Sequence, residues 1–231
     1  MPLSLRPGLT ALFLVFVACT GDPPPAEPPA AAPIEEAAPA EQAATTKVIV
    51  LGDSVAAGLG LPADQAFPAL LADELAERGA PPVEVINAGV SGDTSAGGLR
   101  RLDWLLKQEP DILLLELGGN DMLRGQPPAA TEDNLRQIID RCQERGVTVL
   151  LLGMRAAPNL GPEYTAEFDA LYPRLAEEKG VALLPFLLEG VAGVEAYNQP
   201  DGIHPTAEGH TRVADLVADA LAPLIPPAEA P

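Results

Sequence analysis

Short apolar runs and longer segments with helical periodicity alternate along most of the chain. β-Branched or leucine-rich runs, which predict strands, lie at 48–51, 83–86, 112–117, 147–152 and 181–184. Apolar residues recur at helical spacing at about 67–78, 96–107, 134–145 and 163–179. Thr206 can cap a last helix that ends near residue 221. The run at 112–117 is continuous and apolar, as expected of a strand that is buried on both faces.

This alternation predicts an α/β fold, in which helices cover both faces of a parallel sheet. Ligands of such sheets bind in the crevice beyond the carboxyl ends of the strands. Polar residues gather at these ends, because residues 53–54 follow the first strand, 87–95 the second, and 118–121 the third. Residues 201–204 lie between the fifth strand and the last helix. One edge of the sheet is therefore expected to collect the candidate chemistry.

The first residues of the chain have the features of an export signal. Arg6 supplies a positive charge, and residues 9–18 are apolar but too few to span a bilayer as a helix. Residues 16–19 read Phe-Val-Ala-Cys and resemble a bacterial lipobox, in which the cysteine is lipidated and becomes the mature N-terminus. We predict a signal peptide with a lipobox at 1–19 and lipidation at Cys19. An ordinary secretory signal is the alternative.

A proline-rich segment separates this signal from the predicted domain. Residues 20–46 are rich in Pro, Ala and Glu and contain no basic residue. Such a segment buries too little apolar surface to offset the entropy cost of ordering it, which predicts a disordered linker. The folded domain is predicted at 47–225, and a disordered tail at 226–231. An exported protein with this anchor is expected in the periplasm or at the cell surface, attached to a membrane as a lipoprotein.

Composition excludes some partners and sites. The formal net charge is −19, and no basic cluster is present, so a nucleic-acid partner is not expected. Cys142 is the lone cysteine of the predicted domain, which leaves no disulfide framework and no cysteine metal cluster. We interpret Cys142 as a small residue packed in a helix.

His204 and Asp201 are spaced as a general base and its orienting carboxylate. The chain has two histidines, and His204 lies three residues after Asp201. A turn at Gly202 can bring the carboxylate onto Nδ1 and leave Nε2 free to accept a proton. Ser54 is the candidate nucleophile, although a Gly-Asp-Ser tripeptide can also serve only as a helix cap. His210 lies in the last helix with no acid at a suitable offset, and we interpret it as structural.

Two loops offer donors to a developing negative charge. Gly92 could present a backbone N–H to a bound carbonyl, where a Cβ would crowd the approach. The Asn120 side-chain amide, which follows two glycines, could donate to the same oxygen. Each loop could instead be only a turn, with an N-cap at 89–95 and an Asx-turn at 118–121.

A metal site is the rival use of Asp53, Asp93, Asp201 and His204. The chain lacks the paired histidines that zincins place on a helix, and one suitable histidine gives a metal little support. We therefore predict neither a metal nor another cofactor.

Taken in order, these motifs resemble the SGNH, or GDSL, hydrolase family. The matching blocks are Gly52-Asp53-Ser54, Ser91-Gly92-Asp93-Thr94, Gly119-Asn120-Asp121 and Asp201-Gly202-Ile203-His204. Further likeness at 87–95, 105–108, 115–125 and 184–186 is to the bacterial arylesterase, thioesterase I and lysophospholipase L1 branch. No Gly-x-Ser-x-Gly elbow surrounds any serine, unlike in ordinary α/β-hydrolases.

The resemblance implies a fold and a role for each motif. The fold would be a three-layer α/β/α flavodoxin-like sandwich around a five-stranded parallel sheet. Ser54 would be the nucleophile, His204 the general base and then acid, and Asp201 its orienter. The Ser54 and Gly92 backbone N–H groups and the Asn120 side chain would form the oxyanion hole. The loop at 154–161 resembles the acyl-pocket wall of that branch, which implies substrate-binding residues Met154, Arg155, Pro158 and Asn159.

The implied activity is that of a serine esterase acting on small-molecule or lipid esters. Aryl esters, acyl thioesters and lysophospholipids would be hydrolysed through an acyl-enzyme on Ser54, and an outward location favours lipid or aryl esters over cytosolic acyl-CoA. One alternative is a carbohydrate O-deacetylase of the same fold. The other is a non-catalytic, lipid-anchored binding module, which the loss of Ser54, Asn120 or His204 would have favoured. All of these residues are present.

Overall fold

The computed structural model describes residues 45–227. The predicted signal peptide with Cys19, the predicted linker up to residue 44 and residues 228–231 of the predicted tail lie outside these residues. Among the helices of residues 45–227, none is long and apolar enough to cross a membrane.

Parallel strands form a single five-stranded sheet in the order β2-β1-β3-β4-β5. The strands are β1 (Thr46–Gly52), β2 (Val83–Gly89), β3 (Ile112–Glu116), β4 (Thr148–Leu152) and β5 (Ala182–Leu184). The strand order reverses between β1 and β3, and this is the point at which flavodoxin-like sheets bind ligands.

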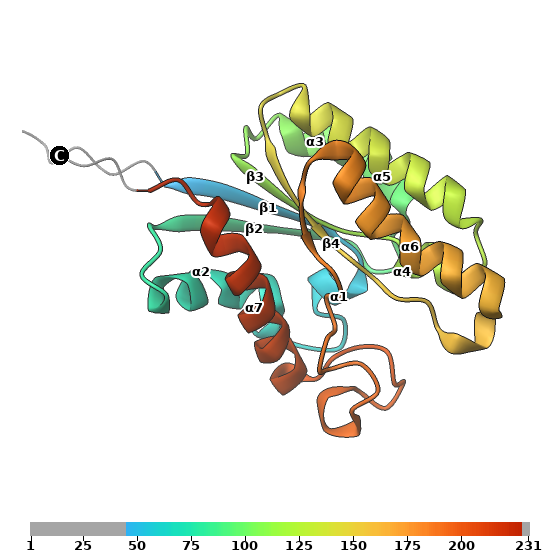
Figure 1. The fold of residues 1–231 in the computed structure, drawn as a ribbon. Coiled ribbons are helices and arrows are strands. Elements are labelled where there is room, and N and C mark those ends of the chain that lie inside the picture. The colour runs from blue at the N-terminus through green and yellow to red at the C-terminus, as the bar shows by residue number, and fades with distance from the viewer. Residues whose placement is uncertain (1–44, 228–231) are drawn as a thin grey trace, which may run out of the picture. The chain divides into compact units, whose positions relative to one another are not determined.

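Helices cover both faces of this sheet. The α-helices are α1 (Ser54–Ala57), α2 (Phe67–Glu77), α3 (Ser95–Leu106), α4 (Gly119–Leu123), α5 (Pro128–Gln143), α6 (Pro162–Lys179) and α7 (Ala207–Leu221). Short 3₁₀ turns are η1 (Ala63–Gln65), η2 (Pro158–Leu160), η3 (Glu195–Tyr197) and η4 (Ala222–Leu224). Figure 1 shows α2 and α7 on one face and α3, α5 and α6 on the other. The predicted three-layer α/β/α sandwich is confirmed.

The core lies between the central strands and these helices. Residues 48–51 of β1 and 113–115 of β3 have no exposed surface, as expected of strands covered on both faces. In the register of the sheet, Val50 pairs with Asn87 of β2 and Leu114 of β3. The last residues of these strands therefore lie side by side at the carboxyl edge of the sheet: Gly52, Gly89 and Glu116.

The structure differs from the predicted elements at β2, at α5 and at the short helix α4. β2 continues to Gly89 where a loop was expected from residue 87, because residues 87–89 keep their parallel pairing with residues 50–52 of β1. α5 begins at Pro128 rather than near residue 134, since proline suits the first turn of a helix. That first turn reads Pro-Ala-Ala-Thr and has no large apolar residue, so periodicity did not reveal it. The short helix α4 was not predicted either.

The expectation that residues 112–117 are uniformly apolar was wrong at one position. Glu116, the last residue of β3, has no exposed surface. Glutamate is almost never fully buried without a partner or a function. Its position beside the end of β1 makes it part of the site described below.

Candidate active site

Ser54 begins α1 at the carboxyl end of β1. Gly52 ends the strand, and Asp53 caps the helix, because its Oδ1 accepts a hydrogen bond of 3.0 Å from the Val55 amide. The expected helix cap is therefore present in the Gly-Asp-Ser tripeptide. Asp53 is the cap, and Ser54 presents its hydroxyl at the start of the helix.

Asp201, His204 and Ser54 form one hydrogen-bonded array. His204 Nδ1 lies 2.6 Å from Asp201 Oδ2, and His204 Nε2 lies 2.9 Å from Ser54 Oγ. Asp201 Oδ1 accepts further bonds of 3.0 Å from the amides of Ile203 and His204. The bond with the His204 ring, followed by these amide bonds, lowers the pKa of Asp201 to about 2. An ionised Asp201 holds the ring so that Nε2 can accept the serine proton.

The loop that carries His204 is hydrogen-bonded to residues 53–59, which hold the candidate nucleophile and are called the nucleophile turn below. The Gln199 backbone N–H donates to the His204 carbonyl at 2.7 Å. The Gln199 side chain donates to the carbonyl of Leu59, which follows α1, at 2.7 Å and to that of Pro205 at 2.9 Å. Sequence reasoning missed Gln199, because its partners belong to a distant turn and to its own loop.

The predicted oxyanion donors come from the ends of neighbouring strands. Gly92 lies in the turn between β2 and α3 with a φ of 81°, a left-handed conformation that glycine adopts without strain. Asn120 lies in α4, and its Nδ2 donates to Asp53 Oδ2 at 2.9 Å. The amide group has a second N–H that remains for a ligand. Within residues 45–227, the backbone N–H groups of Ser54 and Gly92 donate to no other group. Such free, fixed donors are what a developing oxyanion requires.

Arg101 organises the backbone beside Gly92. Its Nε forms an ion pair of 2.8 Å with Asp93 Oδ2. Its two terminal nitrogens donate to the carbonyls of Ala88, at 2.6 Å, and Gly52, at 2.9 Å. One guanidinium thus joins the ends of β1 and β2 to the Gly92 turn. Nothing in the local sequence distinguishes Arg101 from other polar residues of its helix.

Asp121 joins the third motif block to the second. The carboxylate is buried and accepts bonds from the Ser95 hydroxyl at 2.6 Å and the Ser95 amide at 2.8 Å. Asn134 of α5 donates to the same Ser95 hydroxyl at 2.9 Å. These bonds hold the start of α3 against α4, so Gly92 and Asn120 are supported by one buried network.

A pocket of about 340 Å³ opens beside Ser54 and His204. Its volume is at the small end of the range of ligand pockets, about 300–1,000 Å³. Most of its walls are apolar, and they include Val55, Met122, Leu123, Met154, Phe186, Leu188 and Ile203. Such a lining suits an acyl chain better than a polar sugar.

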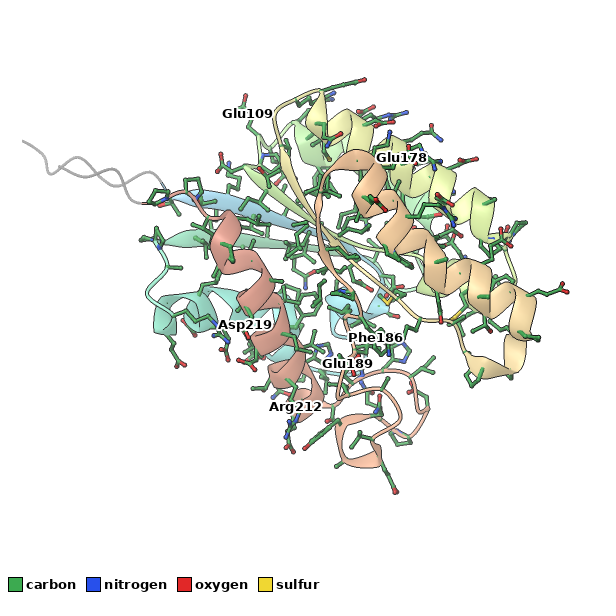
Figure 2. The ribbon with its side chains drawn as sticks, viewed as in Figure 1. Glu109, Glu178, Phe186, Glu189, Arg212 and Asp219 are labelled. Atoms are coloured by element: carbon green, nitrogen blue, oxygen red, sulfur yellow. The ribbon has the colours of Figure 1, made fainter. Side chains whose placement is uncertain are left out.

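The loop at 154–161 forms one wall of this pocket. Met154, Arg155 and Pro158 line it, while Asn159 is exposed on the η2 turn and lies outside the lining. The Arg155 guanidinium lies 4.7 Å from the centre of the Phe186 ring. Figure 2 shows Phe186 in the segment between β5 and α7. The predicted substrate-binding residues therefore reach the pocket except for Asn159.

A larger hollow of about 590 Å³ lies at the opposite end of the strands, lined by residues such as Pro110, Asp111 and Thr148. None of the predicted site residues contributes to it. Ligands of flavodoxin-like sheets bind at the carboxyl ends of the strands, so the pocket at Ser54 is the candidate active site.

Glu116 and Asp53 place two buried carboxyl groups under the nucleophile turn. Burial raises the pKa of Asp53, against hydrogen bonds from the Val55 amide and Asn120 that lower it. Burial raises the pKa of Glu116 well above its ordinary value, and the nearby Asp53 raises it further. Sequence reasoning missed Glu116, although a charged residue inside a buried strand was a signal that could have identified it.

The acidic residues considered for a metal site are engaged elsewhere. Asp93 pairs with Arg101, and Asp201 bonds to His204. In the part of the chain that the structure describes, no group of three or more His, Cys, Asp or Glu side chains is arranged to hold a metal ion.

The chain is similar to known hydrolases over most of its length. Residues 50–212 match the GDSL-like lipase/acylhydrolase family. The chain is 45% identical to the esterase TesA of Pseudomonas aeruginosa over 183 residues, which cover 79% of this chain and 90% of that protein. It is 44% identical to thioesterase 1/protease 1/lysophospholipase L1 of Escherichia coli K12 over 79% of this chain and 86% of that protein.

A solved structure is also similar. The psychrotrophic esterase EstA from Pseudoalteromonas sp., in a crystal structure inhibited by monoethylphosphonate, superposes with a TM-score of 0.73 at 32% identity. The match covers 78% of this chain and 98% of that one.

Proposed function

The chain belongs to the GDSL-like lipase/acylhydrolase family, and from this premise we propose that it hydrolyses esters through an acyl-enzyme formed on Ser54. The observation that carries the proposal is the continuous array in which His204 lies 2.6 Å from Asp201 and 2.9 Å from Ser54. A nucleophile, a base and an orienting group within hydrogen-bond reach are the elements of acyl transfer.

Acylation begins when Ser54 Oγ attacks the ester carbonyl and its proton moves to His204 Nε2. The imidazolium that forms is stabilised by Asp201, which stays ionised. Collapse of the tetrahedral intermediate breaks the bond to the leaving group, and His204 returns the proton to that oxygen or sulfur. Water then repeats the sequence on the acyl-enzyme and releases the carboxylic acid.

The oxyanion of each tetrahedral intermediate is accepted by the backbone N–H groups of Ser54 and Gly92 and by the Asn120 amide. Three donors support this assignment: two backbone groups without another partner among the described residues, and a side chain oriented by Asp53. Because they are fixed before the reaction, they stabilise the developing charge without reorganisation.

The substrates we propose are carboxylic and thio esters with an apolar acyl group, including aryl esters, acyl thioesters and lysophospholipids. The apolar pocket at Ser54 supports this class. The names of the relatives, an esterase and a thioesterase/lysophospholipase, agree with it. Hydrolysis rates for p-nitrophenyl esters of increasing chain length, palmitoyl-CoA and lysophosphatidylcholine test the choice. A preference for acetylated sugars over all of these would instead identify a carbohydrate O-deacetylase.

Substitution of the nucleophile tests the mechanism. We expect Ser54→Ala to lose p-nitrophenyl butyrate hydrolysis and covalent labelling by a fluorophosphonate, because no other hydroxyl contacts His204 Nε2 among the described residues. Thr211→Ala, which removes an exposed hydroxyl on α7, is the matched control and keeps both.

Full activity of Ser54→Ala would contradict the acyl-enzyme. A wild-type protein that is neither labelled nor active on any ester would instead be the lipid-anchored binding module.

We also propose that the protein is exported and anchored to a membrane through a lipid on Cys19. The lipobox-like Phe-Val-Ala-Cys at 16–19 supports this, and the predicted linker at 20–46 would connect the anchor to the catalytic domain. Mass spectrometry of the mature N-terminus tests it. A lipid-modified Cys19 as the first residue is the expected result, and an unmodified N-terminus at another residue would contradict it.

A further inference from the structure

Glu116 lies directly beneath the turn that presents the nucleophile. It ends β3 in register with Gly52 of β1, and it has no exposed surface. Its Oε2 accepts the Asp53 amide at 2.8 Å and the Ala56 amide at 3.3 Å. These two amides flank Ser54, so a single carboxyl oxygen fixes both sides of the nucleophile turn.

The glycine of the Gly-Asp-Ser block makes room for this carboxyl group. A Cβ on Gly52 would lie 2.3 Å from Glu116 Oε2 and 2.5 Å from the Ala56 Cβ. Neither contact is possible without moving the turn or the carboxyl group. Gly52 and Glu116 are therefore matched to each other, although they lie on different strands.

Glu116 also reaches the oxyanion donors through Asp53. Glu116 Oε2 accepts the Asp53 amide, so the carboxyl group fixes the backbone of Asp53. Asp53 in turn accepts the bond of 2.9 Å from Asn120 Nδ2. The order of contact is Glu116, Asp53, Asn120 and then the site of the oxyanion.

We propose that Glu116 is a positioning residue for ester hydrolysis, which fixes the Ser54 turn from below and, through Asp53, orients the Asn120 amide. The proposal rests on the proposed function and adds a residue that does not contact the substrate pocket. Glu116 is not among the residues that line that pocket.

The protonation of Glu116 follows from its surroundings. The groups that face the pair are the Tyr172 hydroxyl from α6, the Arg101 guanidinium on the Gly52 carbonyl, and His204 beyond Asp53. Burial raises the pKa of Glu116 well above its ordinary value, and the nearby Asp53 raises it further, which favours the neutral carboxyl group. Glu116 Oε2 accepts both backbone amides, and glutamine can accept them through its amide oxygen. Leucine has no acceptor.

Two substitutions of Glu116 therefore test the proposal. We expect Glu116→Leu to lower kcat on p-nitrophenyl butyrate by about 10–100-fold with little change in KM, because a displaced nucleophile turn loses near-attack geometry. Glu116→Gln should keep kcat within about threefold of the wild type, since it preserves the hydrogen bonds. Rates are expressed per active site titrated with a fluorophosphonate, so misfolded protein does not contribute.

Glu132→Gln is the matched control. Glu132 is also buried, but it pairs with Arg136 and Arg174 between α5 and α6, outside the pocket. We expect this variant to change thermal stability and to leave kcat per titrated site at the wild-type value.

Coupling to Asn120 distinguishes positioning from general support. If Glu116 acts partly through Asn120, the loss of kcat in Glu116→Leu/Asn120→Ala is smaller than the product of the two single losses. Multiplicative losses would overturn the part of the proposal that concerns Asn120. Wild-type kcat in Glu116→Leu, or equal losses in the Leu and Gln variants, would overturn the proposal as a whole. Neither result affects the assignment of Ser54, which the Ser54→Ala variant tests separately.

Discussion

Single residues in this site each serve more than one neighbour. Asp53 caps α1 with one carboxylate oxygen and orients Asn120 with the other. Asp201 accepts a hydrogen bond from the His204 ring with one oxygen and hydrogen bonds from two loop amides with the other. In the proposed mechanism, each carboxylate therefore fixes a catalytic side chain to the backbone, which keeps the donors and the base in place before a substrate arrives.

Asn120 is the residue for which this arrangement predicts the largest effect short of losing the triad. We expect Asn120→Ala to lower kcat on p-nitrophenyl butyrate by about 10²–10³-fold, because one of the oxyanion donors is lost. KM should change little, since the donor acts mainly on the transition state. Steady-state kinetics measure both, with Gln137→Ala, an amide on the exposed face of α5, as the control. A variant that raises KM and keeps kcat would assign Asn120 to substrate binding instead.

At the scale of elements, α2 and α7 are held together by contacts that neither helix could supply alone. Phe67 begins α2 after Ala66, which offers no capping side chain. His210 of α7 takes that role, because its Nδ1 accepts the Phe67 amide at 3.2 Å. Arg78, at the other end of α2, forms ion pairs with Asp215 and Asp219 of α7. His210 thus has the structural role expected from the sequence.

His210 makes the stability of this helix pair depend on pH. Burial lowers the pKa of His210 to about 4 from its ordinary value of 6.5. As the pH falls, the unfolded chain therefore takes up the proton before the folded protein does. The contribution of the neutral His210 to the unfolding free energy is complete above pH 6.5 and is lost as the pH falls toward 4. Between about pH 7 and about pH 4.5, we expect the wild type to lose about 2 kcal/mol more unfolding free energy than His210→Gln does.

Urea unfolding at the two pH values measures this difference. Taking the wild type minus the variant cancels the contributions of the other titrating groups, including Asp53 and Glu116. Thr211→Ala on the same helix should keep the wild-type pH dependence. Equal pH dependence of the wild type and His210→Gln would contradict the role assigned to the neutral imidazole.

On the scale of the whole molecule, charge distinguishes substrates that the pocket alone does not. The chain carries a formal net charge of −19. A protein with this charge repels anions over distances comparable to the Debye length, about 8 Å at physiological ionic strength. Neutral esters are unaffected by this field.

Ionic strength should therefore separate neutral from anionic substrates. We expect kcat/KM for an anionic p-nitrophenyl ester of a dicarboxylic acid to rise about 2–10-fold from low to physiological salt, because screening reduces the repulsion. The value for p-nitrophenyl butyrate should stay constant. A fall in the anionic rate with added salt would indicate attraction at the pocket mouth, where Arg155 would be the first residue to substitute.

The sequence predicted the fold, and it named the candidate triad residues because each lies in a short local motif. Apolar runs that alternate with helical periodicity determine an α/β sheet, and turn residues after its strands mark the active edge. It predicted less about Asn159, which lies outside the pocket lining, and about the start of α5, where apolar periodicity is absent. Periodicity reports which residues are buried, and it carries no information on which distant groups they meet.

The chain's own sequence thus determined the order of elements, the candidate nucleophile and base, and the candidate oxyanion donors. Tertiary structure alone decided that Ser54 and His204, 150 residues apart, come within hydrogen-bond distance. It also decided that Glu116 supports the nucleophile turn and that His210 caps α2. The physical reason is that these contacts join elements brought together by strand order and register. A buried carboxyl group or imidazole acquires its protonation state and its role from neighbours that are remote in sequence.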